Sequence, residues 1–320
     1  MVLPSLLLCL GGCERPQPEP LTIAVNAWPG YQYFAVAEEQ GFAEEAGFAG
    51  IRIVETASLA DSVRAFERGQ VDLIGGTLAE LADINSHHVR DARAILALNR
   101  SIGGDMIVAR DRFRTLASLR DSRLALEPGS VNALVFAAAA RQAGFGIDDV
   151  TLVSLPQGEM ERAFERDEID AAVTYPPVAG ELLDRPDVHR LFDTREAPNA
   201  VVDILIAAES VIEESPDPLQ SLIIAYERAL DWSRDHPGES RRIIARHAGI
   251  TPEELIALEP TIEMFSVSGQ REMWVPGGVL ERDLEGAIRV LTELHDAEVT
   301  THASAPEMLD ARIIEGIASP

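Results

Sequence analysis

Short apolar runs alternate along the chain with longer stretches in which apolar residues recur every three or four positions. Apolar runs of about five residues indicate buried strands, and the three-to-four spacing indicates one buried face of a helix. We expect strands at 21–25, 51–55, 71–76, 92–98 and 105–110, with helices at 31–41, 59–68 and 78–85 between them. This alternation predicts an α/β domain with a mostly parallel sheet and helices on both faces.

The same pattern begins again in the middle of the chain, with strands expected at 123–127, 151–155 and 169–175 and helices at 131–143 and 158–166. Residues 66–73 (FERGQVDL) and 164–171 (FERDEIDA) share Phe, Glu, Arg and Asp at equivalent positions of a helix end, a turn and a strand. Chance similarity in an acidic, Ala-rich chain is the alternative. The shared structural context favours an internal repeat, and therefore two lobes of similar design.

Two α/β lobes can form a binding site between them, because ligands of open parallel sheets lie beyond the carboxyl ends of the strands. A hinge between the lobes would let them close and exclude water. Strands at 105–110 and 201–207 are the expected crossings, so we assign 21–104 plus 205–320 to lobe 1 and 105–204 to lobe 2. Helices expected at 218–234, 239–247, 252–258 and 279–294 would cover lobe 1.

The first residues have the pattern of a targeting signal. Residues 1–12 (MVLPSLLLCLGG) form an apolar stretch that is too short to span a bilayer and ends in small residues. Residues 10–13 (LGGC) resemble a bacterial lipobox, which predicts lipidation of Cys13 and a Pro-rich spacer at 13–20. No Lys or Arg precedes the apolar run, so a cleaved signal without lipid and a buried segment are alternatives. The favoured interpretation is a periplasmic or cell-surface protein held at a membrane by a lipid anchor.

Charge and motif content argue against several functional classes. The 53 acidic and 27 basic residues give a formal net charge of −26, which repels nucleic acid, so no nucleic-acid partner is expected. The only cysteines are Cys9 and Cys13, so the body of the chain has neither a disulfide nor a thiolate metal site. No metalloprotease, hydrolase, dinucleotide-binding or P-loop motif occurs. We therefore predict no catalytic residues, no metal site and no cofactor.

An ordered set of segments resembles a known family. These segments are LTIAVNAWPGYQYFAVAEEQGF, FERGQVDLIGGTLAEL, LNRSIGGDMIVAR, LASLRDSRLALEPGSVN, RDEIDAAVTYPPV and RLFDTREAPNAVVDILI, within residues 21–295. Together they resemble the nitrate, sulfonate and taurine family of ABC-transporter substrate-binding proteins. The resemblance implies a type II periplasmic-binding-protein fold, which has two α/β lobes with a hinge and a ligand cleft between them. It also implies delivery of a small-molecule solute to an inner-membrane ABC transporter permease, but it does not identify the solute.

The loop after the first expected strand carries the first candidate ligand-binding residues. Asn26 can donate and accept hydrogen bonds, and Trp28 or Tyr31 can stack on a solute. Gly30 lets the backbone N–H groups at the helix start approach the cleft. The alternative is that Trp28 belongs to the core of a lobe.

Further candidates follow the next two strands. Ser58 is placed to cap a helix, which alone would explain it, although a capping hydroxyl at a cleft can also meet a ligand. Gly76 permits close approach of the backbone, and Thr77 supplies a hydroxyl at a helix start. We interpret Glu80, one turn later, as a helix-face charge in preference to a ligand partner.

The expected crossings contribute the remaining candidates. Arg100, Ser101 and Asp105 flank a Gly-Gly turn, where Asp105 could accept from an ammonium or amidine group and Arg100 could pair with an acidic one or neutralise Asp105. Ser130 and Tyr175 follow strands of lobe 2, and local turn chemistry is the alternative for both. The last candidate, Asp203, precedes the return strand.

The candidates comprise aromatic, hydroxyl and acidic groups with a single Arg. A purely anionic ligand would call for more cations, so a taurine-like zwitterion or a nitrogen-bearing heterocycle is at least as consistent as a sulfonate or nitrate. The predicted function is capture of such a solute for an ABC importer. A sensing adaptor for a membrane receptor is the alternative, and an enzyme on the same fold or a ligand-free structural lipoprotein fits less well.

Overall fold

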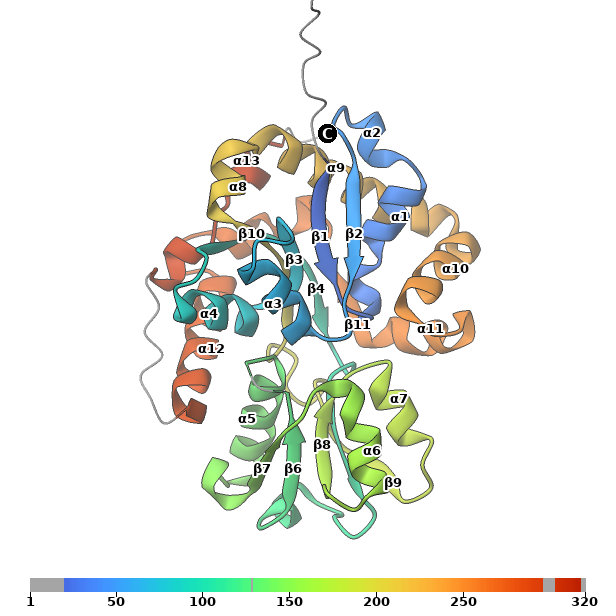
Figure 1. Cartoon of the computed structure of the whole chain (residues 1–320), viewed down its shortest axis with the longest axis vertical. Coiled ribbons are helices and arrows are strands. Elements are labelled where there is room, and N and C mark those ends of the chain that lie inside the picture. Colours follow the sequence, from blue (N-terminus) through green and yellow to red (C-terminus); the bar gives the residue numbers. More distant parts are fainter. Residues whose placement is uncertain (1–19, 128, 296–302, 318–320) are drawn as a thin grey trace, which may run out of the picture.

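The computed structural model describes residues 20–127, 129–295 and 303–317. Residues 1–12, Cys13 and nearly all of the expected spacer lie outside the described residues. Within the described chain, two sheets form two α/β lobes, one above the other in Figure 1. The predicted α/β class with two lobes is therefore confirmed. No helix in the described ranges is long and apolar enough to cross a membrane.

Lobe 1 is built on a six-stranded sheet with the strand order β11-β4-β10-β3-β1-β2. Its strands are β1 (Leu21–Val25), β2 (Ile51–Glu55), β3 (Leu73–Thr77), β4 (Ala92–Ser101), β10 (Val202–Ala208) and β11 (Ile262–Met264). Lobe 2 is built on a five-stranded sheet with the order β7-β6-β8-β5-β9. Its strands are β5 (Met106–Arg110), β6 (Arg123–Leu126), β7 (Thr151–Ser154), β8 (Ala171–Thr174) and β9 (Val188–Asp193).

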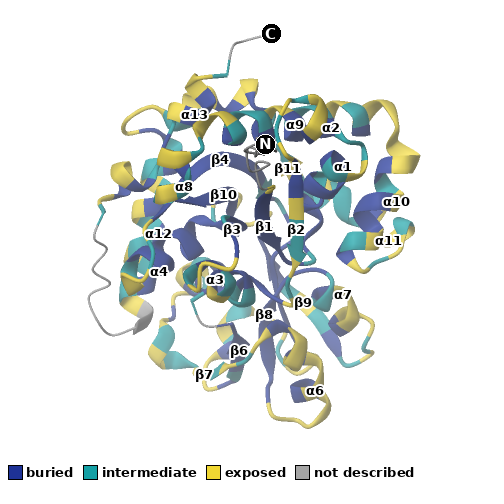
Figure 2. Ribbon diagram, turned by 45° about the horizontal axis from the view of Figure 1, so that its top comes forward, coloured by how far each residue is buried: buried dark blue, intermediate teal, exposed yellow. Residues whose placement is uncertain are grey.

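Helices cover both faces of the lobe 1 sheet, with α1, α10 and α11 on one side and α3, α4 and α12 on the other (Figure 1). The helices of lobe 1 are α1 (Tyr33–Glu39), α2 (Phe42–Glu45), α3 (Leu59–Glu67), α4 (Leu78–His87), α8 (Glu209–Glu214), α9 (Pro216–Asp235), α10 (Pro237–Ala248), α11 (Pro252–Leu258), α12 (Val279–His295) and α13 (Arg312–Glu315). Lobe 2 has α5 (Asn132–Ala143), α6 (Met160–Glu165) and α7 (Val178–Leu183). Figure 2 shows buried strands inside and exposed residues on the outer helix surfaces.

The expectation of a mostly parallel sheet is wrong. Of the nine strand pairings among the described residues, five are antiparallel, and these involve β5, β10 and β11. The chain passes between the lobes twice, and β5 and β10 are the strands that come directly after these passages. Each therefore enters its sheet from the end at which the strands of the βαβ units leave it, and runs antiparallel to them. Strand order and direction depend on this crossing, which the local apolar pattern does not encode.

The internal repeat has the same local structure in both lobes. In each copy a helix, α3 or α6, leads through a turn into a strand, β3 or β8, which pairs in parallel with β1 or β6. An Asp just before the strand accepts a hydrogen bond from a backbone N–H at the start of its neighbour. The donor is Thr22 for Asp72 and Arg123 for Asp170, and both distances are 2.8 Å. The similarity of the two sequence segments thus reflects one repeated hydrogen-bonded unit.

Two short segments connect the lobes, residues 102–105 after β4 and 194–201 before β10. The hydroxyls of Ser101 and Thr194 lie 2.9 Å apart, which ties the two segments together. Helix α12 of lobe 1 also packs against α5 of lobe 2. The expected lobe boundary after residue 104 lies in the first segment, whereas that after residue 204 lies inside β10. The residues at which each lobe begins and ends stay predictions.

Candidate functional site

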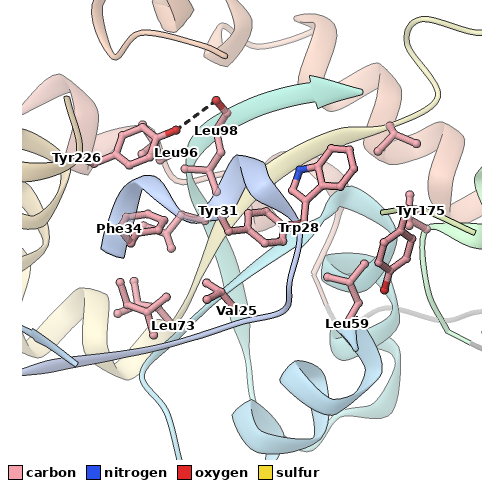
Figure 3. Close-up of a cluster of buried hydrophobic side chains, with 14 of the residues drawn as sticks. Val25, Trp28, Tyr31, Phe34, Leu59, Leu73, Leu96, Leu98, Tyr175 and Tyr226 are labelled. Atoms are coloured by element: carbon pink, nitrogen blue, oxygen red, sulfur yellow. Dashed lines mark hydrogen bonds between the residues drawn. The ribbon is translucent and has the colours of Figure 1, made fainter. Parts of the chain in front are cut away.

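A small buried cavity lies between the lobes, at the ends of β1, β3, β8 and β10 and next to the first crossing. Its volume is about 10 Å³, roughly the room that one water needs. Figure 3 shows Trp28, Tyr31, Leu59 and Tyr175 from around this space. The lining residues are Asn26, Trp28, Tyr31, Leu59, Thr77, Asp105, Val131, Tyr175, Val201 and Asp203.

A larger hollow, about 500 Å³, lies on the outer face of lobe 1 and is lined by residues such as Tyr33, Arg234 and Glu259. All of its lining residues belong to lobe 1, and its charged groups are ones that solvent reaches. The interlobe cavity is the better candidate site because it lies at the carboxyl ends of strands from both lobes and is surrounded by buried ionisable side chains.

The first loop forms one wall of the cavity and connects the two lobes. Asn26 accepts from the Trp28 backbone N–H at 3.2 Å, and its Nδ2 donates to the Tyr175 hydroxyl at 3.2 Å. The rings of Trp28 and Tyr175 meet edge to face, with centroids 6.5 Å apart. The Trp28 Nε1 donates to Asn99 Oδ1 at 3.2 Å. A Cβ at Gly30 would lie 2.5 Å from Asn99 Nδ2, so close packing of this wall requires glycine there.

Asp203 forms the lobe 1 side of the cavity and is 3% exposed. Its Oδ1 accepts from the Tyr31 hydroxyl, whereas its Oδ2 is buried without a hydrogen-bond partner. Burial, together with the nearby Asp105 and Glu80, raises the pKa of Asp203 well above its usual range. Burial and the Asp203 carboxyl also raise the pKa of Tyr31.

Asp105 reaches the cavity from the first crossing. Its backbone N–H donates to the Ser101 hydroxyl at 3.0 Å, and this hydroxyl also meets Thr194. Burial raises the pKa of the Asp105 carboxyl to about 7, because the stabilising bond from Ser101 is weaker than the cost of removing the charge from water. Ser101 thus holds the crossing in place and is outside the cavity lining.

Glu80 is buried between the lobes, so its interpretation as a helix-face charge is wrong. Its Oε2 accepts from the Thr77 backbone N–H at 2.8 Å, and its Oε1 accepts from the Val131 backbone N–H at 2.8 Å. Thr77 and Glu80 form a capping box at the start of α4, and the Thr-x-x-Glu spacing was the available sequence signal. The bond to Val131 joins α4 of lobe 1 to the start of α5 in lobe 2.

Glu127 adds a fourth buried carboxyl that the sequence analysis did not select. The Ser58 hydroxyl hydrogen bonds to it, but burial still raises the pKa of Glu127 to about 7. Its Oε2 has no hydrogen-bond partner. Ser58 also caps α3 by accepting from the Asp61 N–H at 3.2 Å. Ser58 therefore both caps the helix and meets a polar group beside the cleft.

The structure divides the predicted ligand-binding residues into two groups. Those that line the cavity are Asn26, Trp28, Tyr31, Thr77, Asp105, Tyr175 and Asp203. Those outside the lining are Gly30, Ser58, Gly76, Arg100, Ser101 and Ser130.

Most members of the second group have a structural contact. Ser130 donates to the Glu127 carbonyl at 2.9 Å, and Gly76 packs against Ile206. Arg100 points away from the cavity and pairs with Glu263 at 2.5 Å. Contact with a solute stays a prediction for every candidate.

The ionisable side chains in and beside the cavity that carry a formal charge are acidic. No Arg or His side chain is among the described residues that line it, and the chain contains no Lys. Two acids line the cavity and two more lie beside it. Within the ranges that the structure describes, no group of three metal-ligating side chains occurs.

Comparison with known proteins gives a consistent result. The model of the family described as NMT1/THI5 like matches residues 28–240. A Brucella abortus (strain 2308) protein, described as a candidate binding protein, is 24% identical over 214 residues, or 60% of this chain. The chain spans 66% of the length of that relative.

Solved structures match over more of the chain. The alkanesulfonate-binding protein SsuA of Xanthomonas axonopodis pv. citri has a TM-score of 0.76 at 15% identity, covering 93% of this chain and 100% of its own. The aliphatic sulphonate-binding protein SsuA of Escherichia coli has a TM-score of 0.69 at 17% identity, covering 88% of each chain. The desulfurization enzyme DSZB has a TM-score of 0.65 at 15% identity, covering 92% of this chain and 98% of its own. These likenesses confirm the expected periplasmic-binding-protein fold.

Proposed function

Because the chain belongs to the NMT1/THI5-like family, we propose that it is an extracytoplasmic solute-binding protein that captures a small polar solute between its lobes for an ABC importer. The observation that carries the proposal is the interlobe cavity, where seven of the predicted ligand-binding residues meet beside buried, incompletely hydrogen-bonded polar groups. Such groups are costly in an empty protein and are satisfied by a bound partner.

Capture requires the lobes to separate. A cavity of about 10 Å³ holds no solute larger than a water, so the arrangement seen here is a closed one. The two crossing segments, held together through Ser101 and Thr194, supply a hinge about which the lobes would open. The contacts across the cleft include polar ones, Asn26 to Tyr175 and Glu80 to Val131, which a hinge motion can exchange for water.

The likeness to DSZB raises an enzyme as the rival. The only cysteines of the chain lie at positions 9 and 13, and no His is among the described lining residues. The lining offers acids, an amide and aromatic rings, which suit recognition better than nucleophilic chemistry. We therefore propose a binding protein and not an enzyme.

A ligand screen tests the proposal. Thermal unfolding would be followed with sulfonates, taurine, nitrate, amines, amidines, amino acids and pyrimidines. A solute at one hundred times its Kd should stabilise the protein by about 2.7 kcal/mol, which is a rise of several degrees in Tm. Trp28→Phe, in the cavity wall, should weaken this ligand at least tenfold, whereas Trp232→Phe, where the ring stacks on His236 on the outer surface, should not. Failure of every class to shift Tm, or a shift unaffected by Trp28→Phe, would contradict the proposal.

We further propose that residues 1–12 are removed as a signal peptide and that a lipid on Cys13 anchors the protein at a membrane, where it meets its permease. The LGGC segment supports this placement. Expressed in a bacterial host, the protein should incorporate an alkyne-tagged fatty acid, and Cys13→Ser should abolish the label while Cys9→Ser leaves it unchanged. Equal labelling of the Cys13→Ser variant would refute the anchor.

A further inference from the structure

Two backbone N–H groups at this site, one at the start of α4 and one at the start of α5, already have a carboxylate partner. Free N–H groups at helix starts are a common anion site in proteins. Here α4 and α5 both begin at the cleft, and Glu80 accepts from both, at Thr77 and at Val131, with distances of 2.8 Å. A sulfonate or nitrate would have to displace this side chain or lie beside its charge.

Two buried carboxyl oxygens at this site, in contrast, accept no hydrogen bond. Asp203 Oδ2 lines the cavity region without a partner in a side chain that is 97% buried, and Glu127 Oε2 is likewise unpartnered nearby. Asp105 lines the same cavity from the first crossing segment, close enough to raise the pKa of Asp203. Two unpartnered amide donors, on Asn99 and Asn132, belong to residues outside the lining.

Within the described ranges, no Arg or His forms an ion pair with these acids. Among the described residues, Arg64 is the Arg that acts on Glu127, and it pairs with Asp61 at 2.6 Å on the surface. Arg100 pairs with Glu263 outside the cleft. Buried carboxyl groups without a counter-ion either keep a proton or await a positive partner.

Resting on the proposed function, we propose that the solute carries a positively charged nitrogen with N–H donors, as in a protonated amine or an amidinium, and that Asp203 and Asp105 receive it. One N–H would meet Asp203 Oδ2, while Tyr31 keeps Oδ1 occupied and so holds the carboxyl in place. Trp28 and Tyr175 line the same cavity, so their aromatic rings can contact the same cation.

Ligand binding should then depend on pH. The groups that face Asp105 are Ser101, Glu80 and Asp203, and Tyr31 faces Asp203. With the pKa of Asp105 near 7, its carboxylate fraction rises about tenfold between pH 6 and pH 8, and the apparent affinity for a cation should rise by at least that factor, because the raised pKa of Asp203 acts in the same direction. An anionic ligand should show the reverse trend.

Ligand-observed NMR with four small probes tests the inference on the mature chain. Ethylammonium and acetamidinium carry the cation, ethanesulfonate has a similar size and the opposite charge, and nitrate is a second anion. Probes of this size bind at best in the high micromolar to millimolar range, which the method detects. We expect both cations to bind at pH 8 and at least tenfold more weakly at pH 6, and we expect the anions not to bind.

Variants in which an amide replaces one carboxyl test whether the ligand is held by its positive charge. Asp203→Asn and, separately, Asp105→Asn should weaken acetamidinium at least tenfold, whereas the exposed Asp184→Asn, which changes net charge equally, should leave it unchanged. Circular dichroism would check that each variant folds. The inference is overturned if no cation binds, if ethanesulfonate binds more tightly than either cation, or if both Asn variants keep the parent affinity. Solute capture itself would survive these outcomes if the wider screen finds a ligand sensitive to Trp28→Phe.

Discussion

The Asp105→Asn variant is expected to unfold at a higher temperature than the parent protein at pH 8, with a smaller gain at pH 5. Burial raises the pKa of Asp105 from 3.8 to about 7 in the folded protein. Between these values the folded state holds a proton that the unfolded state has released, so stability falls as pH rises through this window and is constant above it. This rise in the pKa of Asp105 lowers the free energy of unfolding by on the order of 4 kcal/mol at pH 8, as an upper limit, and by about 1–2 kcal/mol at pH 5.

The amide of Asn has the shape of the carboxyl and no charge, so the variant avoids this cost. Urea unfolding at pH 5 and pH 8 would measure the difference. Asp193, equally buried in lobe 2, is the matched control. Burial alone would raise its pKa, but hydrogen bonds from Arg195 outweigh burial and lower it. Asp193→Asn should therefore lose stability at pH 8, and a loss of the same sign for Asp105→Asn would contradict the argument.

A stabilised Asp105→Asn protein would also bear on function. If the same substitution abolishes cation binding while it raises Tm, then the carboxyl is kept at a cost in stability because the ligand needs it. Such an exchange of stability for binding is common where a site holds groups that the fold alone disfavours.

The Trp28→Ala variant should lose about 3–5 kcal/mol of unfolding free energy, the range for removing a large buried aromatic ring. Trp28 is 4% exposed and fills the junction of the loop after β1, the first crossing and lobe 2. A Cβ on Gly104 would lie 2.4 Å from its ring, so the crossing backbone packs directly on it.

Chemical unfolding would measure this loss, and Tm should fall by on the order of 10 °C. Trp232→Ala is the control, since this partly buried ring stacks on His236 at a centroid distance of 4.8 Å, on the outside of lobe 1. It should cost less than half as much. Equal losses for the two variants would mean that Trp28 is not a packing element of the interlobe wall.

Local chemistry explains which elements could be predicted. The apolar runs of β1, β2 and β7 and the helix of α11 lie where periodicity placed them, because each is one compact stretch with turn or capping residues at its ends. Strands β9 and β11 were missed. The polar His189-Arg190 pair interrupts the apolar pattern of β9, and β11 has three residues that form a strand only because they pair with β4.

The residues of the candidate site likewise divide into those that the sequence could predict and those that it could not. Loop residues such as Asn26, Trp28 and Tyr175 could be found because polar and aromatic groups that follow strand ends meet at one edge of a sheet. The placement of Arg100 could not be found, because its partner Glu263 is 163 residues away on a strand that the pattern did not reveal.

By itself, then, the sequence determined the α/β class, the repeated lobe, the resemblance to a family and most of the residues that meet in the cleft. These follow from spacing and residue type over short stretches. Only the tertiary structure decided that the sheets are mixed, that Glu80 bridges two helix starts, and that Glu127 and Asp203 keep unpartnered oxygens. Burial and hydrogen-bond partners of a carboxyl depend on which lobe closes over it, and that contact joins residues far apart in the chain.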